Sequence, residues 1–200
     1  MTKSQYLILA SGSSGRLELL KNVDIIPDKI IVTDVDETPY KKEKPRIYCK
    51  RVAEAKLNAA VKKLSKKNAF IIAADTTAVS GGKFLHKSDN DNGVRKCLEA
   101  ISGRRHKVYS AVFCGYVEDG KLVDVKNRVV ITTVMFKRFT KDEIDFLICS
   151  KQGIGKCGGI QISGLASRYV KFISGSFSNV VGLPLFETTQ LLNSLGYKLM

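Results

Sequence analysis

The chain has 200 residues, of which 44% are hydrophobic and only four are proline. This length and composition are typical of one globular domain, or of two small lobes that share one sheet. The apolar run Phe70–Ala74 is far shorter than the roughly 18 to 20 residues that a membrane-spanning helix needs. Tyr6–Ala10 is likewise too short for the hydrophobic region of a signal peptide, which has about 7 to 15 residues. We therefore expect a cytoplasmic protein without a membrane partner.

The chain is strongly basic, with a formal net charge of +14. Such an excess suits nucleic acid, an anionic surface or a phosphorylated small molecule, and charge alone does not choose among them. Part of this positive charge is expected on one helix, which carries Lys62, Lys63, Lys66 and Lys67. The simplest interpretation is that these lysines form a solvent-exposed face. The aromatic residues do not interleave with this basic run as a base-stacking surface would, so nucleic acid is the less favoured partner.

The cysteines support neither a disulfide framework nor a zinc site. There are five of them, widely spaced and without a Cys-x-x-Cys motif, and the chain has only two histidines. Structural zinc sites and disulfide scaffolds both need closer or paired spacings. We therefore expect free thiols and no metal bound through cysteine.

The first half of the sequence alternates strands and helices. Tyr6–Ala10 is a predicted strand, followed by a turn of small residues and a short helix. Ile25–Val32 is predicted as a second strand, and Pro45 is well placed to begin a helix that runs to about Leu64. Its buried stripe is expected to contain Ile47, Val52, Ala55, Ala59 and Val61. Phe70–Ala74 is then a buried strand expected to stop at Asp75-Thr76.

The second half is richer in strands. A turn at Gly81-Gly82 precedes a predicted helix over 91–101. Val108–Val117 and Leu122–Phe136 are β-rich segments separated by Asp119-Gly120, a pair that suits a tight antiparallel hairpin. Thr140 can cap a helix that ends near Cys149, residues 153–164 are rich in glycine, Tyr169–Ile173 is a further strand, and Pro184 opens a C-terminal helix. The alternation, without a repeat or a linker, predicts one α/β domain on a mixed sheet.

Ser11–Arg16 has the composition of a phosphate-binding turn. It places small residues, hydroxyl groups and a guanidinium where a strand passes into a helix, and free backbone N–H groups and the helix dipole favour an anion there. An ordinary serine-capped turn has the same appearance. Ser102–His106 is a second, weaker candidate, either an anion-binding turn or a turn whose histidine caps a backbone group.

Carboxylates follow two of the predicted strands. Asp36-Glu37 and Asp75 stand at strand ends, from which α/β sheets present ligand-binding groups. Such oxygen ligands suit Mg²⁺ or Mn²⁺ bound together with a polyphosphate. A single loop carboxylate is more often only solvated. Asp75 stands out because it directly follows a buried strand. Lys56 and Lys87 are candidate phosphate contacts that their charge alone does not single out.

Taken in order, these segments resemble the Maf family of nucleotide pyrophosphatases. The family pattern Ser-x-Ser-Pro-Arg-Arg-x-Glu-Leu-Leu is matched by residues 11–20. Further matches follow in order at 36–37, 51–56, 73–76, 82–87, 102–106, 155–158 and 175–185. The resemblance covers residues 7 to about 195, and eight short motifs in the right order are together far more specific than any one of them.

The resemblance implies a fold, a reaction and a set of site residues. The fold would be an elongated mixed β-sheet flanked by helices, shared with the inosine triphosphate pyrophosphatases, with two lobes around a cleft. Residues 1–200 would form this single domain, as a homodimer. The substrate would be a nucleoside triphosphate, cut between its α and β phosphates. Phosphates would be held by Ser13, Arg16, Lys56 and Lys87. Glu37 and Asp75 would hold a divalent cation, Mg²⁺ or Mn²⁺, and Asp75 would orient or deprotonate the attacking water.

Two departures from the family pattern affect the substrate site. Ser14 and Gly15 replace a proline and the first arginine of a pair, so one positive charge is missing. Ser163 stands where the thymidine and uridine triphosphate subgroup has a glutamine of its substrate pocket. Gln161 lies two residues earlier and is therefore expected on the same face of a strand as Ser163, so it could substitute. Thymidine and uridine triphosphates and base-modified nucleotides all stay open as substrates. The other functional hypothesis is a basic nucleic-acid-binding or cell-division regulatory protein.

Overall fold

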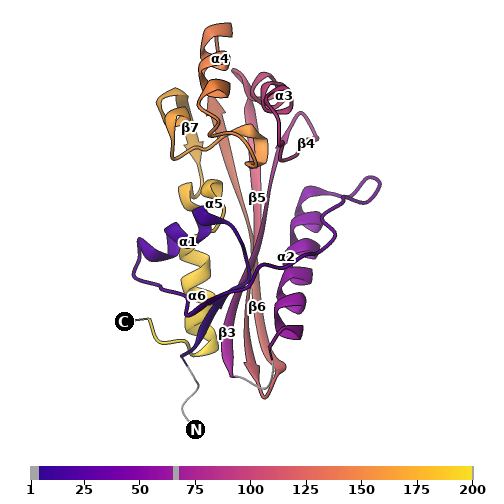
Figure 1. The fold of residues 1–200 in the computed structure, drawn as a ribbon, viewed down its shortest axis with the longest axis vertical. Helices are drawn as coiled ribbons and strands as arrows, with labels where there is room; N and C mark the ends of the chain where they lie inside the picture. Colours follow the sequence, from indigo (N-terminus) through magenta and orange to yellow (C-terminus); the bar gives the residue numbers. More distant parts are fainter. Residues whose placement is uncertain (1–4, 65–67, 200) are drawn as a thin grey trace. The chain divides into compact units, whose positions relative to one another are not determined.

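The computed structural model describes residues 5–64 and 68–199. These residues form a seven-stranded mixed sheet with the order β2-β1-β3-β5-β6-β7, and β4 pairs with β3 (Figure 1). The strands are β1 (Leu7–Leu9), β2 (Lys29–Ile30), β3 (Ala69–Ser80), β4 (Lys83–Leu85), β5 (Arg105–Glu118), β6 (Lys121–Phe136) and β7 (Val170–Ser174). The helices are α1 (Ser14–Lys21), α2 (Pro45–Lys62), α3 (Asp91–Ile101), α4 (Lys141–Cys149), α5 (Phe177–Val181) and α6 (Leu185–Leu195), with 3₁₀ turns η1 (Cys157–Gly159) and η2 (Leu165–Tyr169). The predicted α/β class with a mixed sheet is confirmed.

The chain divides into two compact units. The first contains the described residues up to Asp75, Ser110–Val130 and those from Gly182 onward. The second contains Thr76–Tyr109 and Ile131–Val181. Strands β3, β5 and β6 each contribute residues to both units.

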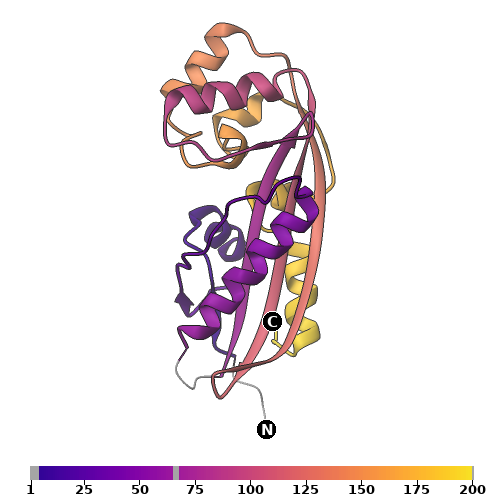
Figure 2. The same ribbon diagram turned by 90° about the vertical axis from the view of Figure 1, so that its right-hand side faces the viewer.

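In the first unit, β1 is the centre of a small parallel arrangement. It pairs in parallel with β2 and with β3, as in Ile8 beside Ile71. Helices α1 and α2 lie on one face of these strands and α6 lies on the other (Figure 2). Because both faces are covered, β1 and the first half of β3 are apolar, and Leu7–Leu9 and Phe70–Ala74 are fully buried.

Several local sequence signals act as predicted. Pro45 occupies the first turn of α2, where its missing N–H is not needed. Thr140 caps α4 in a reciprocal capping box with Glu143. Asp119 and Gly120 both adopt positive φ, at 48° and 77°, so the β5–β6 hairpin has the twist of a type I′ turn.

Three predictions about individual elements are corrected. The strand expected over 25–32 is reduced to the two residues of β2, which are exposed at the edge of the sheet. Strand β3 does not stop at Asp75 but continues to Ser80, because its end pairs with β4, as in Ala78 beside Leu85. The buried stripe of α2 is rotated, so that Ile47 is 56% exposed.

The basic end of α2 is solvated, in agreement with the simpler interpretation of its charge. Lys62 and Lys63 are exposed, and the Lys63 ammonium donates to the Val32 carbonyl at 2.9 Å. Lys66 and Lys67 lie outside the described residues. Among the helices that the structure describes, none is long and apolar enough to cross a membrane.

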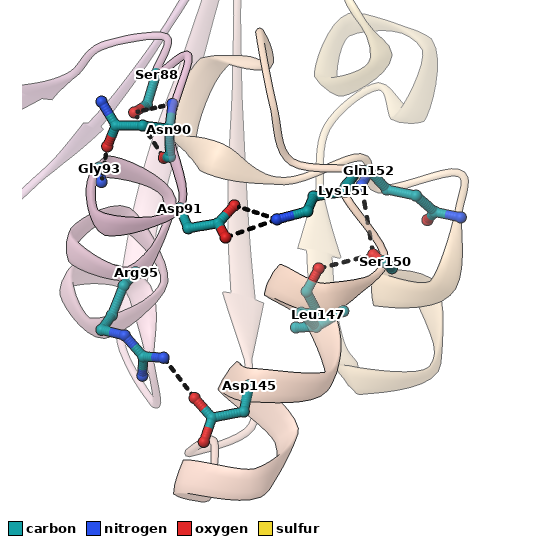
Figure 3. Close-up of polar contacts among 10 residues, drawn as sticks. All are labelled: Ser88, Asn90, Asp91, Gly93, Arg95, Asp145, Leu147, Ser150, Lys151 and Gln152. Atoms are coloured by element: carbon teal, nitrogen blue, oxygen red, sulfur yellow. Dashed lines mark hydrogen bonds and ion pairs between the residues drawn. The ribbon is translucent and has the colours of Figure 1, made fainter.

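In the second unit, α3 packs against α4 and against η1. Figure 3 shows the polar contacts that join this layer. Lys151, just after α4, contacts Asp91 at the start of α3 at 2.6 Å, and Arg95 pairs with Asp145 one turn further along. Both pairs are half-exposed, so they orient the two helices more than they stabilise them.

The glycine-rich segment after α4 follows a tightly folded path. A Cβ on Gly153 would lie 2.3 Å from the Gly159 carbonyl oxygen, so only glycine fits there. The Gly155 N–H donates to the Ser88 carbonyl at 2.9 Å, and the Leu165 N–H donates to the Gln152 side chain at 2.8 Å. These contacts give residues 150–165 a defined course although they form no long element.

The capping box of α4 gives a first testable prediction. Thr140 is exposed, so its main contribution is the bond that its hydroxyl accepts from the Glu143 N–H. We expect Thr140→Ala to lower the free energy of unfolding by about 1 kcal/mol in urea titrations. Thr140→Ser keeps the hydroxyl and should retain most of the stability. Equal losses in the two variants would contradict a role through capping.

Candidate active site

Asp75 is a buried carboxylate in the middle of a strand. Its side chain is only 4% exposed, and it directly follows the apolar half of β3, residues 69–74. Burial of a charge is costly unless a partner compensates it, so a cation close to Asp75 is required. The sequence analysis placed Asp75 at a strand end, whereas it lies inside β3, away from the water that would solvate a strand end.

Lys56 supplies that cation from α2. Its ammonium lies 2.8 Å from Asp75 Oδ1 and 2.6 Å from Glu37 Oε1. The Lys56 side chain is 8% exposed, whereas that of Glu37 is 38% exposed. Lys56 thus belongs to the buried face of α2, which the apolar pattern alone had placed elsewhere. The structure brings together three of the predicted site residues in one hydrogen-bonded cluster.

One carboxylate oxygen in this cluster is not satisfied. Asp75 Oδ2 is buried and has no hydrogen-bond partner within the described part of the chain. Leaving such an atom unpaired costs about 1 to 3 kcal/mol, so a ligand is expected to complete it. Two carboxylates and one ammonium also leave one negative charge in excess. Oxygen ligands with excess negative charge fit Mg²⁺ or Mn²⁺, which take one or two carboxylates together with phosphate oxygens.

The loop that carries Glu37 is tied to α2. The Tyr48 hydroxyl donates to the Glu37 carbonyl at 2.9 Å, and Arg51 donates to the Thr38 carbonyl at 3.0 Å. Arg51 also forms a two-pronged ion pair with Glu43, which lowers the pKa of that carboxyl chiefly through the hydrogen bond from the guanidinium. The same helix therefore positions both Lys56 and its partner Glu37.

The turn at the start of α1 is capped by a serine and has a buried arginine beside it. Ser13 is the N-cap, and its hydroxyl oxygen accepts from the Arg16 N–H at 3.5 Å. The Arg16 side chain is buried, donating from Nη1 to Ser11 Oγ at 2.9 Å and from Nε to the Gly182 carbonyl at 2.8 Å. Arg16 is therefore held in a fixed position beside the first turn of α1.

The remaining predicted site residues belong to the second unit. Lys87 follows β4 and is exposed, and its neighbour Ser88 is bonded to Gly155. Gln161 and Ser163 were predicted to share one face of a strand, and this is wrong. They lie in a turn closed by the Gly164 N–H on the Gln161 carbonyl at 3.0 Å, so the two-residue spacing does not align them. Gln161 is half-buried and Ser163 is exposed.

Sequence reasoning missed a recess in the second unit. It has a volume of about 30 Å³ and is lined mainly by apolar side chains, together with His106, Thr76 and Cys157. His106 is only 5% exposed, and its ring stacks on Phe136 at a centroid distance of 5.7 Å. Burial lowers the pKa of His106 to about 4, so the ring is neutral at pH 7. The pattern around 102–106 indicated a turn but gave no sign of this environment.

The chain has clear relatives. A family model described as "Maf-like protein" matches residues 6–195. A protein of Rickettsia akari named nucleoside triphosphate pyrophosphatase is 45% identical over 194 residues, which cover 96% of this chain and 94% of the relative. Its namesake in Rickettsia felis is 44% identical over 196 residues, covering 98% and 96%. The solved Ham1 protein of Staphylococcus aureus is 18% identical over 66% of this chain and 71% of its own, with a TM-score of 0.43, too distant to add to the argument.

The pairing of Lys56 with Asp75 can be tested through the free energy of unfolding. Lys56→Met leaves Asp75 buried without a cation, so we expect a loss of about 3 kcal/mol in unfolding free energy. The double variant Lys56→Met with Asp75→Asn removes the stranded charge and should recover most of that loss. Lys62→Met, an exposed lysine on the same helix, is the control and should change stability little. Additive losses in the double variant would argue against the pairing.

The low pKa of His106 predicts a dependence of stability on pH. Because the folded-state pKa of about 4 lies below the ordinary value of 6.5, the unfolded chain binds the proton more tightly. The unfolding free energy is therefore independent of His106 protonation above pH 6.5. It decreases as pH falls from 6.5 toward 4, by about 3 kcal/mol in total. The comparison is wild type against His106→Phe, by urea unfolding at several pH values. The difference between the two curves should change across this window, and a constant difference would contradict the buried neutral ring.

Proposed function

Because the chain belongs to the Maf-like protein family, we propose that it hydrolyses nucleoside triphosphates between the α and β phosphates, giving a nucleoside monophosphate and pyrophosphate. The observation that carries the proposal is the buried cluster of Glu37, Lys56 and Asp75, with one carboxylate oxygen left for a ligand. Relatives that are 45% and 44% identical over nearly their whole length are named for this activity.

In this proposal Asp75 is the central catalytic residue. Its Oδ2 orients the attacking water and accepts its proton, while Lys56 holds Oδ1 and fixes the direction of the carboxylate. Glu37 and Asp75 would also hold a divalent cation, Mg²⁺ or Mn²⁺. When bound, that cation supplies positive charge against the phosphate oxygens of the leaving pyrophosphate. No covalent nucleophile is needed, because positioning and charge stabilisation are sufficient for this kind of reaction.

Phosphate binding is assigned to Ser13, Arg16, Lys56 and Lys87. The Ser13 oxygen already accepts the Arg16 N–H, so its own O–H remains to be donated to a phosphate oxygen. The N–H groups of the first turn of α1 favour the same anion. Lys87 is the proposed contact from the second unit, as the family pattern implies.

The base is proposed to contact the segment that contains Gln161 and Ser163. Ser163 is exposed and short, and Gln161 lies in a turn, so the glutamine-dependent recognition of thymidine and uridine triphosphates is not reproduced by simple substitution. A homodimer and a cytoplasmic location remain predictions from the family resemblance and the sequence. A nucleic-acid-binding role is not favoured, since in the sequence the aromatic residues do not interleave with the basic run as a base-stacking surface would require.

The test is a pyrophosphate-release assay with purified protein, Mg²⁺ or Mn²⁺, and the canonical ribo- and deoxyribonucleoside triphosphates. We expect pyrophosphate rather than orthophosphate, and a rate at least about 100-fold lower in Asp75→Asn because the proton acceptor is lost. Asp124→Asn, on a half-exposed aspartate of β6, is the matched control and should be fully active. Release of orthophosphate, or an Asp75→Asn variant as fast as the wild type, would contradict the assignment.

A further inference from the structure

Glu37 is carried by a loop rather than by a helix or a strand. Residues 31–44 connect β2 to α2, and their only local structure is a turn at 41–42. A side chain on such a segment takes many positions unless other bonds fix the backbone beneath it. Glu37 Oε1 nevertheless lies 2.6 Å from the buried Lys56 ammonium. The bonds that fix this loop therefore determine whether the buried cluster assembles.

Two side chains of α2 hold the main chain of the loop at Glu37 and at the next residue. The Tyr48 hydroxyl donates to the Glu37 carbonyl at 2.9 Å, and Arg51 Nη2 donates to the Thr38 carbonyl at 3.0 Å. Tyr48 and Arg51 are three residues apart, so they are neighbours on the surface of the helix. Both bonds end on main-chain oxygens, so they fix the position of Glu37 without competing for its carboxylate.

Arg51 is itself held by the other end of the loop. Its Nε and Nη2 donate to the two carboxylate oxygens of Glu43, each at 2.9 Å. Glu43 Oε2 also accepts the Tyr40 N–H at 2.9 Å, and the guanidinium lies 4.0 Å from the centre of the Tyr40 ring. Arg51 thus joins the start of the loop, at Thr38, to its end, at Glu43, and fixes both against α2.

This arrangement uses the shape of a guanidinium and not only its charge. The two parallel bonds to Glu43 and the flat contact with Tyr40 both need a planar fork of N–H groups, which the ammonium of a lysine lacks. Arg51 belongs to the motif at 51–56, from which the proposed mechanism so far uses only Lys56. The contacts of Arg51 with the loop give this second basic residue of the motif a role.

We propose that Arg51 and Tyr48 are positioning residues that set the affinity of the cluster of Glu37, Lys56 and Asp75 for its divalent cation. The inference rests on the proposed function and adds the residues that hold one of its two carboxylate ligands in place. Groups that orient a metal ligand without contacting the metal typically change metal affinity by about 10- to 100-fold. Because both residues act through Glu37, they affect how well the cation is bound and leave the proton acceptor Asp75 unchanged.

The test measures Mn²⁺ binding to the full-length protein without substrate. The electron paramagnetic resonance signal of free Mn²⁺ gives the Kd. We expect Arg51→Lys and Tyr48→Phe each to raise the Kd by about tenfold or more, and Glu37→Gln to raise it at least as much. Arg46→Met, on an exposed arginine in the first turn of α2, is the control and should leave the Kd unchanged. If Glu37→Gln raises the Kd but neither Arg51→Lys nor Tyr48→Phe does, the proposal is overturned.

Two further measurements separate positioning from a general loss of structure. In the metal-free protein, hydrogen exchange of the amides at 36–40 should be faster in Arg51→Lys and Tyr48→Phe, while exchange in α6 should stay as in the wild type. In the pyrophosphate-release assay, saturating Mn²⁺ should restore kcat in both variants to near the wild-type value, whereas Asp75→Asn should stay slow. Faster exchange throughout the chain, or a kcat that excess Mn²⁺ does not restore, would contradict a role through Glu37.

The binding measurement also distinguishes this inference from the proposed function. If the wild type hydrolyses triphosphates but the two variants bind Mn²⁺ as tightly as it does, this inference fails and the proposed function stands. If no triphosphate is hydrolysed but the wild type binds Mn²⁺ and both variants bind it weakly, the proposed function fails and the positioning role stands. A wild type that binds no Mn²⁺ would overturn the positioning role together with the proposed metal site.

Discussion

The candidate site depends on one buried lysine. Lys56 is placed between Glu37 and Asp75 by α2, the same helix whose Tyr48 and Arg51 hold the Glu37 loop. The ammonium makes burial of Asp75 tolerable, but it satisfies only one of the two Asp75 oxygens. Because the cluster keeps an excess negative charge and an unpaired oxygen, it is complete only with a further cation or donor. The structure is in this sense prepared for a ligand.

Local features of the fold could be predicted from the sequence because their causes are local. Pro45 sets the start of α2, Thr140 caps α4, and Asp119-Gly120 forms the hairpin turn, each through the conformational preference of the residues themselves. Features that depend on distant partners were missed. Asp75 lies inside a strand because β4 pairs beyond it.

The candidate site likewise has some features with local causes and others that depend on residues distant in sequence. Glu37, Asp75 and the turn at Ser13 could be proposed as site residues from residue type and position, and ordered motifs linked them to one family. The burial of Lys56 could not be predicted, because a lysine on a helix is expected to be solvent-exposed unless the positions of its carboxylate partners are known. His106 is the clearest case, since its low pKa arises from burial in a fold that brings Phe136, from another strand, against its ring.

The most direct test of this account is the position of a cation at Asp75. A crystal grown with Mn²⁺ and a triphosphate that cannot be cut between the α and β phosphates would locate the ion by its anomalous scattering. The account predicts an ion bound to Asp75 Oδ2 and Glu37 at about 2.0 to 2.6 Å, with Lys56 still on Asp75 Oδ1. An ion held elsewhere, with Oδ2 still unpaired, would contradict it.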